Sequence, residues 1–202
     1  MTRDEALARL TGPGEPYELV EVAALGRRCR VFRQAPASLR ELYESTASDA
    51  PFLVYENERL TFAETWGCAS RLASWLTREA GVMPGDRVAI AMRNYPEWMI
   101  AFEAITALGA VAVALNALWT ARELAFGLTD SGARVLIADA ERLERWREAG
   151  GEGVRLVGVR LDAAAPGVTS WATIMSAGDP PEPMPGAPQA DDDATILYTS
   201  GS

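Results

Sequence analysis

Along the chain, segments that are mostly apolar alternate with segments in which apolar residues are three or four positions apart. Four runs are mostly apolar, at 87–92, 110–115, 134–138 and 154–161, which is typical of strands buried on both faces by helices. Between them, apolar residues recur every three or four positions, as in amphipathic helices. Strands and helices that alternate with short connections predict an α/β fold, a doubly wound and mostly parallel sheet with flanking helices.

Local signals mark where several of these helices begin. Thr61 with Glu64, and Thr120 with Glu123, form the Thr-x-x-Glu pattern in which each side chain accepts a hydrogen bond from the other residue's backbone N–H. We expect each pair to open a helix. We also expect Asn94 to cap the helix that follows the first buried strand.

The chain divides by pattern into four parts. Residues 1–35 form an N-terminal extension with a short helix and a possible β-hairpin, and residues 36–177 form the α/β subdomain. Residues 178–193 are rich in proline and aspartate and read as an irregular connector. Residues 194–202 are predicted to be a final strand with a Ser/Thr/Gly-rich end.

Composition excludes several classes of chemistry. The 202 residues are 49% hydrophobic and 23% charged, as in an ordinary globular protein. The net charge of −9 argues against nucleic-acid binding, because phosphate neutralisation needs a basic patch. The chain has no histidine, and all 19 cationic side chains are arginine. Ser-His-Asp and Cys-His nucleophiles, histidine metal sites and Schiff-base lysines are therefore excluded.

Cysteine usage and hydropathy predict a cytoplasmic protein. Cys29 and Cys68 have no metal-site or CxxC spacing, so we expect two reduced thiols. The charged first residues lack the apolar stretch of a signal peptide. The most apolar segment, 104–115, falls short of the ~18 residues that a membrane span needs, and we expect no transmembrane segment.

The end of the last predicted strand is the candidate ligand site. Open α/β sheets bind ligands beyond the carboxyl ends of their strands, and Thr199, Ser200, Gly201 and Ser202 follow that strand. Such a loop can turn its amides and hydroxyls toward a phosphate. On composition alone, a flexible tail explains these residues as well.

Residues 195–202, Thr-Ile-Leu-Tyr-Thr-Ser-Gly-Ser, resemble the opening of the phosphate-binding signature of AMP-forming acyl-CoA synthetases, in the adenylate-forming superfamily. That signature continues with Thr-Gly-x-Pro-Lys-Gly. Earlier segments resemble the family in the same order, at 59–64, 81–90, 93–98, 108–111, 115–116 and 130–133. The first 35 residues match only its fatty-acid-ligase-like members.

The resemblance implies the N-terminal α/β subdomain of a fatty-acid–CoA ligase. In this family a carboxylate reacts with MgATP to give an acyl-adenylate and pyrophosphate, and the coenzyme A thiol then displaces AMP. The implied partners are a fatty or other hydrophobic carboxylic acid, ATP with Mg²⁺, and coenzyme A. If the family's residue roles apply to this sequence, the ATP phosphates would be held by Thr199, Ser200, Gly201 and Ser202. Tyr198 would support the end of the strand by packing.

The departure from the family is large. The signature breaks off after Ser202, so its lysine and all later family motifs are absent from this sequence. We therefore expect no catalytic residue within this chain and no ligase activity from it alone. The alternative is a catalytically dead α/β interaction module, or one half of a split ligase that pairs with a complementary C-terminal portion or forms an oligomer. A nicotinamide dehydrogenase is disfavoured, because Gly151-x-Gly153 lacks the third glycine of the fingerprint.

Other polar and aromatic residues leave two interpretations open. The aspartates 191–193 could attract Mg²⁺, although a solvated linker explains them more simply. Arg93, at a strand end, could face an anion or form a surface salt bridge. Four tryptophans, Trp66, Trp98, Trp119 and Trp171, are expected to be core or contact residues.

Overall fold

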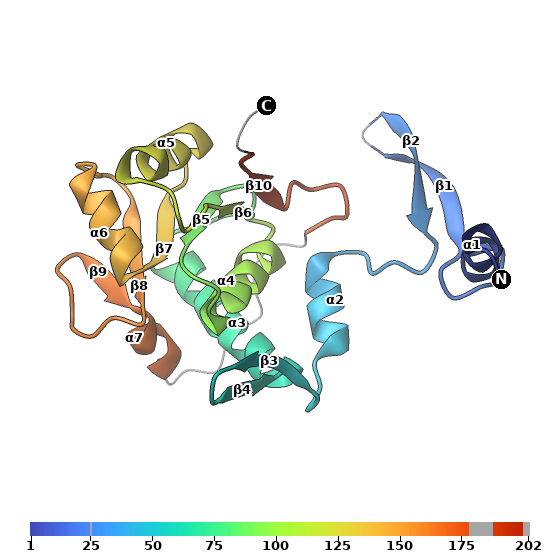
Figure 1. Cartoon of the computed structure of the whole chain (residues 1–202), viewed down its shortest axis with the longest axis horizontal. Coiled ribbons are helices and arrows are strands. Elements are labelled where there is room, and N and C mark those ends of the chain that lie inside the picture. Colours follow the sequence, from blue (N-terminus) through green and yellow to red (C-terminus); the bar gives the residue numbers. More distant parts are fainter. Residues whose placement is uncertain (25, 178–187, 200–202) are drawn as a thin grey trace. The chain divides into compact units, whose positions relative to one another are not determined.

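The computed structural model describes residues 1–24, 26–177 and 188–199 (Figure 1). Its backbone separates into two compact units, Met1–Ala37 and Ser38–Ser202. Each unit is described by itself. No helix in the described ranges is both long enough and apolar enough to cross a bilayer.

The first unit contains a helix and a hairpin. Helix α1 (Arg3–Thr11) starts with a capping box between Thr2 and Glu5. Strands β1 (Leu19–Ala24) and β2 (Arg27–Phe32) pair antiparallel. The predicted short helix and hairpin are therefore confirmed.

The second unit is built around a six-stranded sheet in the order β10-β6-β5-β7-β8-β9. Every neighbouring pair of strands in it is parallel. The strands are β5 (Arg87–Ala91), β6 (Val111–Ala114), β7 (Val135–Asp139), β8 (Arg155–Val159), β9 (Val168–Ser170) and β10 (Thr195–Leu197). The predicted parallel α/β sheet is confirmed, with β9 as a strand that the sequence pattern did not reveal.

Helices cover both faces of this sheet. They are α3 (Phe62–Arg78), α4 (Pro96–Ala107), α5 (Ala121–Ser131), α6 (Ala140–Glu148) and α7 (Trp171–Ser176). Val88 and Ile90 of β5 belong to the hydrophobic core with α3, α4 and α7, whereas Ala89 and Ala91 belong to the core with α5 and α6. This alternation follows from the two-residue period of a strand, and it explains why these strands are apolar throughout.

A small hairpin and one further helix complete the second unit. Strands β3 (Pro51–Tyr55) and β4 (Glu58–Thr61) pair antiparallel, and β4 leads directly into α3. Helix α2 (Leu39–Thr46) contacts α4. A hydrogen bond from Arg40 Nε to the Ala107 carbonyl, 2.7 Å long, fastens α2 to the end of α4.

The capping predictions have different outcomes. Both Thr-x-x-Glu pairs form complete capping boxes at the starts of α3 and α5. The prediction for Asn94 was wrong, because Tyr95 occupies the N-cap position of α4 and makes no side-chain cap. Pro96 is the first residue of that helix, and its preset φ and missing N–H reduce the need for a capping side chain.

Candidate functional site at the carboxyl edge of the sheet

The candidate site lies where the chain leaves β5, β6 and β7. Strand β6 lies on one side of β5 and β7 on the other, so connections from the centre of the sheet diverge to opposite faces (Figure 1). Helix α4 follows β5 onto one face, and α6 follows β7 onto the other. Such a switch of direction creates the crevice where open α/β sheets bind ligands.

A cavity of about 590 Å³ opens at this edge, next to the ends of β5 and β6. This volume is in the range typical of small-molecule sites. Its walls combine aromatic rings with polar side chains. The residues of these two kinds are Tyr55, Tyr95, Trp98, Arg93, Asn94 and Asn116.

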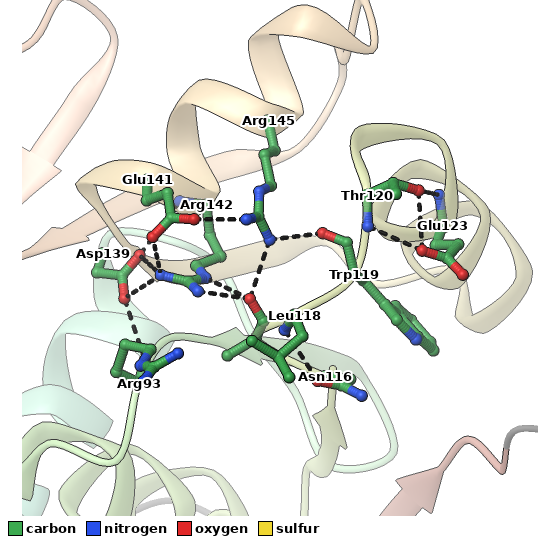
Figure 2. A network of polar contacts seen from close by, with 11 residues as sticks. Arg93, Asn116, Leu118, Trp119, Thr120, Glu123, Asp139, Glu141, Arg142 and Arg145 are labelled. Atoms are coloured by element: carbon green, nitrogen blue, oxygen red, sulfur yellow. Dashed lines mark hydrogen bonds and ion pairs between the residues drawn. The ribbon is translucent and has the colours of Figure 1, made fainter.

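A buried ion pair holds the loops around the crevice together. The Asp139 carboxylate accepts hydrogen bonds from the Arg142 guanidinium at 3.2 Å and from the Arg93 backbone N–H at 3.0 Å (Figure 2). The side chains of Asp139 and Arg142 are only 8% and 3% exposed. Hydrogen bonds within the pair offset part of the cost of burying the two charged side chains. It joins the end of β5 to the start of α6.

The same arginine also fixes the loop after β6. Arg142 Nε donates to the Ala117 carbonyl at 2.8 Å, and Arg145 Nη1 donates to the carbonyls of Ala117 and Trp119 at 3.0 and 2.6 Å (Figure 2). Glu141 pairs with both arginines. Two arginines of α6 therefore hold in place the loop that forms one wall of the cavity.

Arg160 supports the aromatic wall of the cavity. Its guanidinium makes two hydrogen bonds to the Glu58 carboxylate, at 2.8 and 2.9 Å, and another to Glu97 at 3.1 Å. It also lies 5.0 and 4.9 Å from the ring centres of Tyr55 and Tyr95. The hydrogen bonds to Glu58 raise the pKa of Arg160 further above its usual range. Arg160 thereby ties the β3–β4 hairpin to the start of α4.

The predicted phosphate-binding residues are described only at their first position. Thr199 is exposed and follows Tyr198, just beyond the end of β10. Ser200, Gly201 and Ser202 lie outside the described residues. Strand β10 is the neighbour of β6, so the two strand ends share one edge of the sheet.

Tyr198 has the packing position predicted for it. Its hydroxyl donates to Asp130 Oδ2 at 2.7 Å and to the Gly127 carbonyl at 3.3 Å, and its ring makes edge contacts with Trp119 and Phe126. Burial, followed by the hydrogen bond to Asp130, raises the pKa of Tyr198. The hydroxyl therefore stays a neutral donor that fixes the end of β10 against α5.

The remaining polar candidates fall in separate places. The aspartates 191–193 are exposed, and no group of three potential metal-ligating side chains occurs in the described ranges. For Arg93 the interpretation as a surface salt bridge was wrong: no ion pair of its side chain is found among the described residues, and it lines the cavity instead. Both cysteines are free thiols.

The tryptophans are half-buried and pack against the two hydrophobic cores, as expected. Trp66, Trp98 and Trp171 pack on the core beneath α3 and α4, and Trp119 packs on the core beneath α5 and α6. Trp98 in addition lines the cavity. The sequence analysis missed this second position, and it missed Asp139, Arg142 and Arg160 altogether. The one available signal was an aspartate directly after a buried strand and three residues before an arginine.

An open, doubly wound parallel sheet with a cavity at its carboxyl edge defines an α/β domain of the class that binds ligands at its strand ends. The chain belongs to the AMP-binding enzyme family, whose profile matches residues 40–202. The resemblance to adenylate-forming enzymes is thus confirmed at the level of the family.

Relatives of known activity are CoA ligases that act on different acids. The chain is 35% identical over 145 residues to an oxalate–CoA ligase of Arabidopsis thaliana, across 71% of this chain and 28% of that protein. It is 35% identical over 153 residues to a long-chain-fatty-acid–CoA ligase of Mycobacterium tuberculosis, again across 71% of this chain and 28% of that protein. The chain therefore spans less than a third of the length of these relatives.

A solved structure shares the fold. The anthranilate CoA ligase AuaEII, solved in complex with anthranoyl-AMP, matches with a TM-score of 0.75 over 81% of this chain and 32% of that chain. The sequence identity is 24%, so this likeness establishes the fold alone.

Proposed function

We propose that this chain supplies the N-terminal α/β part of an ATP-dependent acid–CoA ligase. The observation that carries the proposal is the family match, which covers residues 40–202. Relatives that act on oxalate and on long-chain fatty acids both align with this chain. Their shared reaction class, joining a carboxylic acid to coenzyme A, is therefore the activity we assign to the whole enzyme.

Within this chain, Thr199, Ser200, Gly201 and Ser202 are the residues proposed to hold the ATP phosphates. Their place in the sequence, directly after the parallel strand β10 and Tyr198, supports this role, because backbone amides of a loop that follows a strand can point toward one anion. Tyr198 fixes the strand end through Asp130 and Gly127. The loop would thus leave the sheet from a rigid support, which positioning of a phosphoryl group requires.

The proposed reaction has two steps, and each forms one bond and releases one leaving group. A carboxylate oxygen attacks the α-phosphorus of MgATP, forming the acyl-adenylate and releasing pyrophosphate. The thiol of coenzyme A then attacks the acyl carbon, forming the thioester and releasing AMP. The proposed substrate is a hydrophobic carboxylic acid, with a fatty acid as one member of that class, and the proposed location is the cytoplasm.

The 202-residue chain alone is proposed to be inactive, because its sequence contains no lysine to neutralise the phosphates. A second candidate, a catalytically silent interaction module, is favoured by one observation. Strand β10 is at the edge of the sheet, and Leu197 on it is 71% exposed. An exposed sheet edge with an apolar side chain favours pairing with another polypeptide, such as a complementary C-terminal portion.

ATP–pyrophosphate exchange tests these proposals. A protein that carries this chain and continues with Thr-Gly-x-Pro-Lys-Gly should exchange label when supplied with a hydrophobic acid, and Ser200→Ala should lower the rate about tenfold or more. Thr195→Ala, within β10, is the matched control and should leave the rate within about twofold. No exchange with oxalate, aromatic or fatty acids by the folded longer protein would contradict the ligase proposal. Exchange by the 202-residue chain would contradict its inactivity.

A further inference from the structure

The cavity at the ends of β5 and β6 is lined by aromatic, amide and cationic side chains. None of its lining residues belongs to β10. Its walls bring three aromatic rings, two side-chain amides and one guanidinium to a single opening. Each of these groups selects for a different part of a ligand.

The guanidinium of Arg93 is the cation available to a ligand. Arg93 is exposed, and no ion pair or hydrogen bond of its side chain is found within the described ranges. Its backbone N–H, by contrast, is held by Asp139 at 3.0 Å. The base of the side chain is therefore fixed while the charged end stays open to the cavity, an arrangement suited to a carboxylate or phosphate oxygen.

The aromatic wall is rigid before any ligand arrives. The rings of Tyr55 and Tyr95 meet edge to face at 5.7 Å, and Arg160 lies against both. Trp98 stacks on Phe102 with ring centres 5.5 Å apart. Rings held in this way bind a planar group at little cost in side-chain entropy.

Several negative charges near the cavity are already engaged by other groups. Glu58 and Glu97 pair with Arg160, and Glu56 interacts with Tyr55. Asp139 is engaged by buried Arg142. A cationic ligand would gain from the rings but would be repelled by Arg93, and a wholly apolar ligand would leave Arg93 and Asn94 without hydrogen bonds.

We propose that this cavity binds a small planar aromatic anion, with the ring against Tyr95 and Trp98 and the anionic group on Arg93. Asn94 and Asn116 line the same opening and supply amide hydrogen bonds to polar ring substituents. The anionic group is a carboxylate, as in an aromatic acid, or a phosphate, as in an aryl phosphate. The inference does not depend on ligase activity, because binding is a property of the described chain.

The test is a titration of the ¹⁵N-labelled 202-residue chain with benzoate and with phenyl phosphate, followed by NMR. We expect saturable shifts of the amides at 92–98 and 115–118, with a Kd of about 1 mM or tighter for at least one ligand. The tighter ligand identifies the anionic group. Benzyl alcohol, which keeps the ring, and inorganic phosphate, which keeps the charge, should each bind about tenfold more weakly or worse.

Two matched variants separate specific binding from general attraction. Arg93→Gln should raise the Kd about tenfold or more, and it should fold normally because the side chain is exposed. Arg147→Gln, in the last turn of α6 and outside the cavity lining, should leave the Kd within about twofold. Equal losses in both variants, shifts scattered over the chain, or no saturation by either ligand would overturn the proposal. None of these outcomes bears on ATP–pyrophosphate exchange.

Discussion

The Asp139 carboxylate caps α6 and neutralises Arg142 at the same time, accepting hydrogen bonds from the Arg142 backbone N–H at 3.1 Å and from its guanidinium at 3.2 Å. A third hydrogen bond comes from the backbone of Arg93, at the end of β5. One side chain thus joins two strand ends and a helix start. The rigidity of the candidate site depends on this junction, because the loops after β5, β6 and β7 all meet it.

Replacing Asp139 with asparagine should destabilise the chain by about 3 kcal/mol. Asparagine keeps the capping hydrogen bond but replaces one carboxylate oxygen with an NH2 group. The loss therefore combines the hydrogen bond from the Arg93 N–H with the charge of buried Arg142, which is left paired with the exposed Glu141. Urea unfolding monitored by circular dichroism measures it. The control is Glu144→Gln, which removes an exposed ion pair of 3.6 Å with Arg147 and should cost less than about 0.5 kcal/mol. Equal stabilities of the two variants would show that the buried pair contributes no more than a surface pair.

Glu103 should make stability fall as the pH rises. It is only 6% exposed, on α4, and burial raises its pKa from 4.5 to about 7. Below about pH 4.5 the carboxyl group is protonated in both the folded and unfolded chain, so it contributes no pH dependence. Between pH 4.5 and 7 the unfolded chain loses the proton while the folded chain keeps it. This difference should lower the free energy of unfolding by about 3 kcal/mol by pH 7.

The measurement is urea unfolding at several pH values between 4.5 and 8, for the unchanged chain and for Glu103→Gln. The variant should lose this decline with pH and should become the more stable of the two at pH 8. Glu152→Gln, which removes an exposed carboxylate, serves as the control and should keep the decline. A Glu103→Gln profile parallel to that of the unchanged chain would refute the assigned role of Glu103.

Two helical glycines should respond to alanine in opposite directions. A Cβ on Gly127 in α5 would lie 2.7 Å from Trp119 Cζ3 and 2.9 Å from Leu115 Cδ2, so Gly127→Ala should destabilise the chain by about 1–3 kcal/mol. At Gly67 in α3 the nearest such atom is 3.9 Å away. Gly67→Ala should therefore stabilise by up to about 1 kcal/mol through helix propensity. Thermal unfolding distinguishes the two, and a stabilised Gly127→Ala would contradict the packing described for Trp119.

The capping box at the start of α3 should contribute about 1 kcal/mol to the free energy of unfolding. Thr61 Oγ1 accepts from the Glu64 N–H at 3.1 Å, and Glu64 Oε2 accepts from the Thr61 N–H at 2.8 Å. Thr61→Ala removes the first of these hydrogen bonds, whereas Thr61→Ser retains it and is the control. Urea unfolding should place the serine variant within about 0.3 kcal/mol of the unchanged chain. Two variants of equal stability would argue against the cap.

Local sequence signals predicted most elements of the second unit, because each signal and its structural consequence lie within a few residues of each other. The two Thr-x-x-Glu pairs satisfy their own helix starts, and the apolar runs predicted strands covered on both faces. The motif at 195–202 led to the family through resemblance, and the family match covers the same residues. The exception at Asn94 is also local: the proline two residues later altered the way the helix begins.

The amino-acid sequence by itself thus determined the order of most elements, although not strand β9, together with the parallel α/β class and the family. The tertiary structure alone decided which side chains meet at the carboxyl edge. Asp139 reaches Arg93 across 46 positions in the chain, and Arg160 reaches Glu58 across 102. Such contacts depend on which strands are neighbours in the sheet, and no periodicity or spacing within one segment encodes that. For the same reason the cavity, with Arg93 open to it, emerged only when β5, β6 and the β3–β4 hairpin were placed together.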